Sequence, residues 1–250
     1  MRFEGTNALV TGGSSGIGYA TAAALIAEGA DRVYVTGRNA QALRTAADRL
    51  GEKAIPVVAD ASSLSDSAAL ADRVRADGVT LDVLFANAGI AESRSFAETD
   101  EAFFDRTFDI NVKGLFFQVQ ALLPVLADGA SVIVNASIVA NKGMANLSVY
   151  NASKAAVRSF ARTWANELKA RGIRVNAVSP GATRTPIMEN GLKMDADAIA
   201  GFDALLAAAA PAGRMGRPDE IAAGVLFLAD ARSSYVNGIE LSVDGGFAQV

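Results

Sequence analysis

The feature that most constrains the fold is a regular alternation between short apolar runs and longer amphipathic or alanine-rich stretches. The apolar runs predict seven strands, at 8–10, 32–36, 55–59, 83–86, 131–135, 174–178 and 239–243. The stretches between them predict helices over 17–28, 39–50, 64–77, 101–126, 150–171 and 219–229. Most of the runs are continuously apolar, which is typical of strands that helices cover on both faces.

Strands that alternate with helices are joined by right-handed crossovers, and such crossovers produce a parallel sheet. We therefore predict a three-layer, doubly wound α/β domain with a mostly seven-stranded parallel sheet. No linker rich in Pro, Gly or Ser divides the 250 residues, so we expect one domain, 1–250. The stretch 183–215 interrupts the alternation with prolines, glycines and short helical pieces. It predicts a lid over a binding site, with an ordinary surface insertion as the alternative.

Composition excludes several chemistries. The chain has no His and no Cys, which excludes an imidazole base, a thiolate nucleophile, and His-ligated or Cys-ligated metal sites. Proton transfer must therefore use Tyr, Lys, Asp or Glu. A net charge of −4 without a basic stripe argues against nucleic acid and anionic membranes as partners. No apolar run reaches the roughly 18 residues of a membrane span, and the cytoplasm is the expected location.

The first predicted strand runs into a glycine-rich loop and then into a helix, as Thr11-Gly12-Gly13-Ser14-Ser15-Gly16-Ile17-Gly18. Glycines let the backbone approach a pyrophosphate closely, and a helix N-terminus offers unpaired N–H groups to it. Ser14 and Ser15 add hydroxyl donors. A tight turn without a ligand is the alternative, because a glycine loop alone is a weak signal.

The end of the second predicted strand bears on the type of cofactor. About 20 residues after the last glycine of such a loop, an acidic residue commonly holds the ribose 2′-hydroxyl of NAD. Here the strand ends in Gly37 and Arg38, with no carboxylate. A guanidinium at this place can pair with a 2′-phosphate, which favours NADP over NAD. The alternative is a solvated Arg38 ahead of Asn39, which we expect to cap the following helix. The pair Ser62-Ser63 is likewise expected to cap the helix over 64–77, and Pro218-Asp219-Glu220 marks a further helix start.

Further candidates follow two other strands, at the sheet edge where ligands bind in such folds. Asp60 and Ala61 follow the third strand, and Asn87, Ala88 and Gly89 follow the fourth. Asp60 can accept from an adenine amino group, and Gly89 lets a ribose lie close to the backbone. For each of them taken singly, an ordinary turn residue is the alternative.

The candidate proton-handling residues are Tyr150 and Lys154, which share one face of a predicted helix at i and i+4. A nearby cation stabilises a phenolate, so we expect Lys154, together with an oxidised nicotinamide, to lower the pKa of Tyr150. Ser137 ends the fifth strand at the same sheet edge, where its hydroxyl can bind a substrate oxygen. Asn111 lies inside a predicted helix, where Asn is a poor helix former, and indicates a kink or a held water.

Together these motifs resemble the short-chain dehydrogenase/reductase family over essentially the whole chain. The resemblance rests on the glycine loop, Asn87-Ala88-Gly89, Asn111, Ser137 with Tyr150-x3-Lys154, and Pro180-Gly181 with Thr185. It implies a Rossmann-type fold in which Tyr150 is the acid/base, Lys154 holds the nicotinamide ribose, Ser137 orients the carbonyl and Asn111 carries a proton-relay water. It also implies a cofactor contact set of Gly12, Ser14, Ser15, Gly16, Ile17, Gly18, Arg38, Asp60, Ala61, Asn87, Ala88, Gly89, Tyr150, Lys154, Pro180, Gly181, Thr183 and Thr185. Ala86 and Thr183 depart from the commoner family pattern.

The implied activity is hydride transfer between NADP(H) and a carbonyl or secondary alcohol. An apolar substrate is expected, because the residues predicted to face it are mostly apolar: Ser137, Ile138, Met144, Leu147, Tyr150, Ile187, Met188 and Leu192. A 3-oxoacyl-carrier reductase is the alternative within the family, because Arg171 matches one basic position of such enzymes. A cofactor sensor without turnover is the alternative from another class, although it would not need Tyr150.

The resemblance also implies a homotetramer or homodimer that pairs through the helices at 101–126 and 150–171. The first of these helices carries five phenylalanines, at 103, 104, 108, 116 and 117, which is more aromatic surface than one buried stripe needs.

Overall fold

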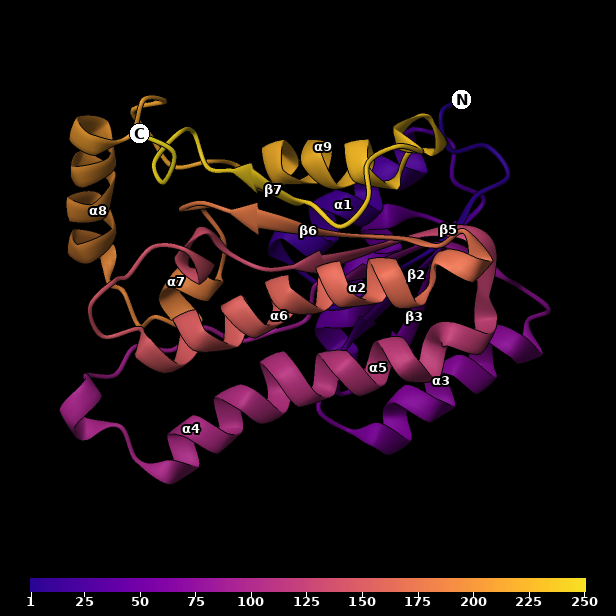
Figure 1. Ribbon diagram of the computed structural model, residues 1–250, viewed down its shortest axis with the longest axis horizontal. Coiled ribbons are helices and arrows are strands. Elements are labelled where there is room, and N and C mark those ends of the chain that lie inside the picture. Colours follow the sequence, from indigo (N-terminus) through magenta and orange to yellow (C-terminus); the bar gives the residue numbers. More distant parts are fainter.

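A single seven-stranded parallel sheet forms the centre of the protein (Figure 1), whose computed structural model describes all 250 residues. The strand order is β3-β2-β1-β4-β5-β6-β7. The strands are β1 (Asn7–Val10), β2 (Arg32–Gly37), β3 (Ala54–Val58), β4 (Leu81–Ala86), β5 (Leu126–Asn135), β6 (Arg174–Pro180) and β7 (Glu240–Val243). The doubly wound α/β prediction is confirmed, and predicted strand bounds differ mainly at β5, which begins earlier.

Helices cover both faces of the sheet (Figure 1). One face is covered by α3 (Leu64–Ala76), α4 (Glu101–Phe108), α5 (Leu115–Leu122) and α6 (Ser148–Glu167). The other is covered by α1 (Gly16–Ala27), α2 (Ala40–Leu50) and α9 (Pro218–Ala229). Two separate apolar cores result, with 23 buried residues on the first face and 18 on the second. No helix is both long and apolar enough to span a membrane.

Strand β4 shows why the runs are continuously apolar. Leu84 and Ala86 belong to the first core, whereas Val83 and Phe85 belong to the second. Successive side chains of a strand point to opposite faces, so a strand between two helical layers needs an apolar residue at every position. The edge strand β3 has no such demand, and its exposure alternates.

The predicted helix at 101–126 is interrupted. It consists of α4, a π-helical segment (Asp109–Gly114), α5 and a 3₁₀ turn (Leu123–Val125). The π segment contains Asn111, where the sequence indicated a kink, and π segments are common at functional sites. The segment ends at Gly114. This position requires glycine, because a Cβ there would lie 2.4 Å from the Ala61 carbonyl oxygen. The neighbouring loop thus decides the local geometry.

Side-chain caps begin several helices as predicted. The Asn39 side chain accepts from the Ala42 N–H and starts α2, and Ser63 accepts from the Asp66 N–H and starts α3. Glu220 accepts from the backbone N–H of Arg217 at 2.7 Å and closes the first turn of α9. These bonds satisfy N–H groups that the helix itself leaves unpaired.

The stretch 183–215 contains α7 (Ile187–Asn190) and the 14-residue α8 (Ala196–Ala209), which is longer than the short pieces predicted. Figure 1 shows α8 at one end of the molecule, near the C-terminus. Met188, Ile199 and Leu206 bury their side chains in a third apolar cluster, together with Ile138 and Phe247. The stretch is therefore packed against the C-terminal residues and the turn after β5.

Candidate active site

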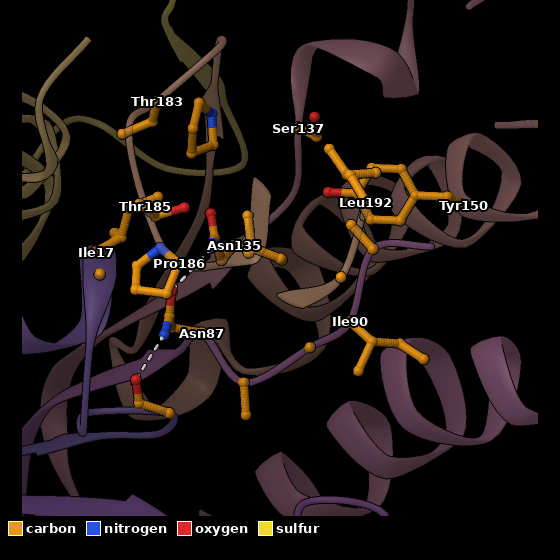
Figure 2. A pocket seen from close by; sticks show the side chains of 18 of the residues that line it. Ile17, Asn87, Ile90, Asn135, Ser137, Tyr150, Thr183, Thr185, Pro186 and Leu192 are labelled. Atoms are coloured by element: carbon orange, nitrogen blue, oxygen red, sulfur yellow. Dashed lines mark hydrogen bonds between the residues drawn. The ribbon is translucent and has the colours of Figure 1, made fainter. Parts of the chain in front are cut away.

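A cavity of about 600 Å³ opens along the carboxyl ends of the central strands, from the glycine loop to α6 and α7. Figure 2 shows a part of it near Tyr150 and Ser137. It is within the size range of cofactor and ligand sites. Nearly all the predicted site residues line it: Gly12, Ser14, Ser15, Gly16, Ile17, Arg38, Asp60, Ala61, Asn87, Ala88, Gly89, Ser137, Ile138, Met144, Leu147, Tyr150, Lys154, Pro180, Gly181, Thr183, Thr185, Ile187, Met188 and Leu192. Gly18 and Asn111 do not.

The glycine loop has the shape of a cradle for a bound group. Gly12 and Gly16 have φ of +65° and +54°, a region that residues with a Cβ rarely adopt. A Cβ on Gly12 would also lie 3.0 Å from Asn87 Nδ2. Ser15 precedes α1 but its side chain makes no capping bond, so the first N–H groups of the helix are not satisfied by it. The loop and helix terminus thus suit an anion such as a pyrophosphate.

Gly18 supports this loop from behind. A Cβ at this position would lie 2.3 Å from the Gly12 carbonyl oxygen and 2.7 Å from Asn87 Nδ2. It does not line the cavity, and its missing side chain lets α1 pack directly against the loop, so its predicted contact with a cofactor stays a prediction.

Asn87 also braces the loop, and its side chain is largely occupied in doing so. Its Nδ2 donates to the Thr11 carbonyl at 2.8 Å. Figure 2 shows that its Oδ1 accepts from Asn135 Nδ2, at 2.9 Å. The Thr11 hydroxyl accepts from the backbone N–H groups of Asn87 and Ala88. Asn135, in contrast, lines the cavity with an Oδ1 atom that is buried and has no hydrogen-bond partner. A ligand donor would satisfy it, so the cavity fits a polar bound group.

Arg38 and Asp60 lie together at the far end of the cavity. Arg38 Nη1 is 4.0 Å from Asp60 Oδ2, and the Arg38 side chain is 63% exposed. The other oxygen of Asp60 accepts from the N–H and the hydroxyl of Ser62. The pair is loose and solvated, so it leaves the guanidinium free to bind a phosphate at little cost.

Tyr150 and Ser137 meet from two different elements. Tyr150 lies in the first turn of α6, and Ser137 follows β5 and begins a 3₁₀ turn (Ile138–Ala140). Figure 2 shows the phenol of Tyr150 directed into the cavity, on the side where the Ser137 hydroxyl lies. Lys154, one turn further along α6, donates from Nζ to the Asn135 carbonyl at 2.7 Å, and this Nζ is 5.8 Å from the Tyr150 ring centroid.

The pKa values of these groups differ from the expectation. Burial raises the pKa of Tyr150 to about 12, and the hydrogen bond with Ser137 only partly opposes that rise. Burial also lowers the pKa of Lys154 to about 8. Lys154 alone does not lower the pKa of Tyr150, because loss of hydration outweighs attraction at this distance, and the predicted joint effect of Lys154 and a nicotinamide stays a prediction.

Asn111 is buried and makes three side-chain hydrogen bonds within the protein. Its Oδ1 accepts from the Ile90 N–H at 2.9 Å, and its Nδ2 donates to the Ile90 carbonyl at 2.9 Å and to Ser153 Oγ at 3.1 Å. The side chain thus joins the π segment to the loop after β4 and to α6. Both N–H donors of Nδ2 are therefore used, whereas Oδ1 keeps one acceptor position.

Several lining residues escaped the sequence reasoning, among them Ile90, Glu92, Phe202 and Phe247. Phe202 lies on α8, and Phe247 is the fourth residue from the end of the chain. No local sequence pattern relates either of them to Tyr150. Glu92 is paired with Arg106 at the cavity wall. Only the packing of the third apolar cluster brings the C-terminal segment to the site.

The comparisons with known proteins agree with this geometry. Residues 12–248 match the family described as Enoyl-(Acyl carrier protein) reductase. The chain is 42% identical to the cis-4-hydroxycyclohexanecarboxylate dehydrogenase of Sinomonas cyclohexanicum, covering 97% of this chain and 96% of that protein. It belongs to the short-chain dehydrogenase/reductase family. It is also 35% identical to a 3-oxoacyl-(acyl-carrier-protein) reductase of Thermotoga maritima, covering 98% and 99% of the two chains.

Solved structures of the short-chain dehydrogenase/reductase family superpose closely on the chain. The levodione reductase structure has a TM-score of 0.91 at 32% identity and covers 99% of both chains. A protein described as a short chain dehydrogenase/reductase family protein has a TM-score of 0.87 at 44% identity, covering 99% of this chain and 100% of that one. The chain is therefore an oxidoreductase of a family that uses NAD(P) and acts on small molecules.

Proposed function

We propose that this protein interconverts an apolar ketone and its secondary alcohol with NADP(H), using Tyr150 as the acid/base. The observation that carries the proposal is the meeting of the Tyr150 phenol and the Ser137 hydroxyl in one cavity with the glycine cradle. A non-catalytic cofactor sensor would need the cradle but no buried phenol beside a hydroxyl.

The protein's own groups handle the proton and the orientation of the substrate. Tyr150, with a pKa of about 12, is protonated at neutral pH and donates a proton to the carbonyl oxygen during reduction. The Ser137 hydroxyl donates to the same oxygen and orients it. The cofactor, when bound, supplies the hydride for reduction or accepts it for oxidation. Lys154 holds the nicotinamide ribose, and its own ammonium group is the cation close to the phenol.

The proton that Tyr150 loses must be replaced from solvent. The two N–H donors of Asn111 are taken by Ile90 and Ser153, so the side chain cannot donate to the proposed relay water, which is bound by a backbone carbonyl of the π segment instead. A π segment leaves the normal i to i+4 pattern of helical hydrogen bonds, which exposes carbonyl oxygens to such a water. In this proposal Asn111 orients the segment that holds the water.

The residues that would hold the cofactor line the cavity from Arg38 to Pro180. Arg38 binds the 2′-phosphate of NADP, because it is exposed, only loosely paired and not faced by a carboxylate on β2. Asp60, Ala61 and Asn87 border the adenosine half. Pro180, Gly181, Thr183 and Thr185 border the nicotinamide half. The Thr183 hydroxyl donates to the Gly181 carbonyl at 3.0 Å, so its departure from the commoner family pattern leaves no unpaired donor in the site.

The substrate end of the cavity favours an apolar ketone. Its walls include Ile90, Ile138, Met144, Leu192 and Phe202, with 183–215 as the lid. Similarity to a cis-4-hydroxycyclohexanecarboxylate dehydrogenase and to levodione reductase supports the reaction type.

Arg171 gives little support to a carrier-protein substrate. It donates to Asp128 at 2.8 Å and to the Leu123 and Leu126 carbonyls, so its guanidinium is committed to the protein. It also lies beyond the end of α6 opposite Tyr150, roughly 30 Å away at 1.5 Å per helical residue.

The experiment that tests the proposal is a turnover panel of cyclic and linear ketones, their alcohols and 3-oxoacyl thioesters, each with NADPH and NADH. We expect the highest kcat/KM for an apolar ketone with NADPH. A preference for 3-oxoacyl thioesters would favour the carrier reductase instead. NADPH binding without turnover of any compound would favour the sensor.

We also propose a homodimer or homotetramer. Phe104 and Phe117 on α4 and α5 are 44% and 37% exposed, and Phe104 stacks on Phe108 at 4.6 Å between ring centroids. Phe116 of α5 contacts Phe160 and Trp164 of α6, so α5 and α6 share one aromatic cluster. Such an apolar surface suits a second copy of the chain.

A further inference from the structure

Glu240, the first residue of β7, binds polar or charged side chains from three separate segments, two through hydrogen bonds and one through an ion pair. Asn141 Nδ2 lies 2.8 Å from Oε1 and 2.9 Å from Oε2, and Ser179 Oγ donates to Oε1 at 2.7 Å. Arg158 Nε lies 2.5 Å from Oε2 in an ion pair that lacks hydrogen-bond geometry, and the Glu240 side chain is only 12% exposed. A carboxylate can accept several such bonds at once.

Each of these partners belongs to a segment that carries a group of the site. Asn141 caps the end of the 3₁₀ turn that Ser137 begins. Arg158 lies on α6 one turn after Lys154, on the helix that also carries Tyr150. Ser179 immediately precedes Pro180 at the end of β6. Glu240 itself does not line the cavity.

We propose that Glu240 is a positioning residue, which holds the Ser137 turn against α6 and the end of β6 and so keeps the Ser137 hydroxyl beside the Tyr150 phenol. The inference rests on the proposed function of Tyr150. Strand β7 does not need this side chain for its place in the sheet, because β7 pairs with β6 through four residues, from Glu240 opposite Ala177 to Val243 opposite Pro180.

The negative charge is essential to this arrangement. A glutamine keeps the size of the side chain, but its NH₂ group cannot accept a bond and would face the Arg158 or Asn141 donors. One or more of these donors would lose its partner, and a partly buried guanidinium without a partner is unfavourable. The turn after Ser137 is then free to move relative to α6.

The test compares Glu240→Gln with Asn141→Ala, which removes only the link to the Ser137 turn at an exposed residue and leaves the charge pair intact. Glu28→Gln is the matched control, because Glu28 also pairs with an arginine, Arg2, but at the surface and away from the cavity. For each variant, kcat and KM are measured in both reaction directions as a function of pH, with the cofactor Kd and the melting temperature.

We expect kcat to fall about ten- to a hundredfold in Glu240→Gln, the loss that displacement of a positioned group by about 1 Å can produce. The cofactor Kd should stay within about twofold. The apparent pKa for alcohol oxidation should rise, because contact with Ser137 lowers the pKa of Tyr150. In Asn141→Ala, kcat should also fall and the apparent pKa should also rise. Both quantities in Glu28→Gln should match the wild type. A merely structural role would reduce the folded fraction without moving the pKa, and that result would overturn the proposal.

A measurement without turnover separates this inference from the proposed function. The chain has four tyrosines, so 3-fluorotyrosine and ¹⁹F NMR can follow Tyr150, with its resonance assigned by Tyr150→Phe. The Tyr150 resonance should titrate at higher pH in Glu240→Gln and Asn141→Ala than in the wild type. An unchanged titration would overturn the inference. Retained activity of Tyr150→Phe would instead overturn the proposed function and leave this titration result valid.

Discussion

Replacing Gly18 by alanine tests how the glycine loop is held. The new Cβ would lie 2.3 Å from the Gly12 carbonyl oxygen, 2.9 Å from the Gly12 carbonyl carbon and 2.7 Å from Asn87 Nδ2. Ordinary contacts of a Cβ begin at 3.4 Å, so the loop must move by about 1 Å relative to α1. The loop backbone has no flexible end that could turn aside, and the Asn87 amide is held by Thr11 and Asn135.

The size of the effect follows from two opposing terms. Overpacking of this kind costs about 1–3 kcal/mol, whereas alanine improves the helix propensity by about 1 kcal/mol. The propensity term acts equally on the free and bound protein, so it changes stability but not cofactor affinity. If the displaced loop loses that 1–3 kcal/mol of cofactor binding, the NADPH Kd rises about 5- to 150-fold.

Fluorescence titration with NADPH measures this Kd, and thermal unfolding measures the net change in stability. Gly201→Ala in α8 is the matched control, because no atom lies within 4 Å of its added Cβ. The control should gain thermal stability and keep the wild-type affinity. The reasoning is refuted if Gly18→Ala binds NADPH within about twofold of the wild type and melts as high as the control.

Four further outcomes are expected. Tyr150→Phe should lower kcat about 10²- to 10⁴-fold and leave the NADPH Kd within a few-fold, and full residual activity would contradict its role. Arg38→Ala should weaken NADPH far more than NADH in direct titrations, whereas equal losses would refute the phosphate contact. Alcohol oxidation should accelerate as the pH rises from about 6 to 8, because it needs the phenolate form of Tyr150, whose pKa is about 12. Carbonyl reduction needs the protonated phenol and should not accelerate over this range. A flat oxidation profile would count against this. Light scattering should show a dimer or tetramer that Phe117→Glu weakens, and a wild-type monomer would exclude the proposed interface.

Much of the architecture follows from local patterns. Apolar residues at successive positions of β4 predict a strand between two helical layers, because each side chain meets a different core. The capping residues Asn39 and Ser63 were also readable from the sequence, since a cap needs only its own helix. The glycine loop was readable for the same reason.

Features that depend on distant neighbours could not be predicted in this way. The sequence indicated a kink at Asn111 but not its cause. The amide of Asn111 meets the Ile90 backbone and Ser153, and Gly114 packs on Ala61, so the helix predicted over 101–126 becomes two helices with a π segment between them. No spacing in the sequence specifies these contacts, because their partners lie many residues away.

The sequence by itself therefore determined where the strands lie along the chain, the helix caps, the glycine loop and the residues with the chemistry for proton transfer. The tertiary structure alone decided what surrounds them. Gly18 became a packing contact, and the pKa of Tyr150 rises rather than falls. The physical reason is that hydration and close contacts are properties of space around an atom, and the chain creates that space only when distant segments pack together.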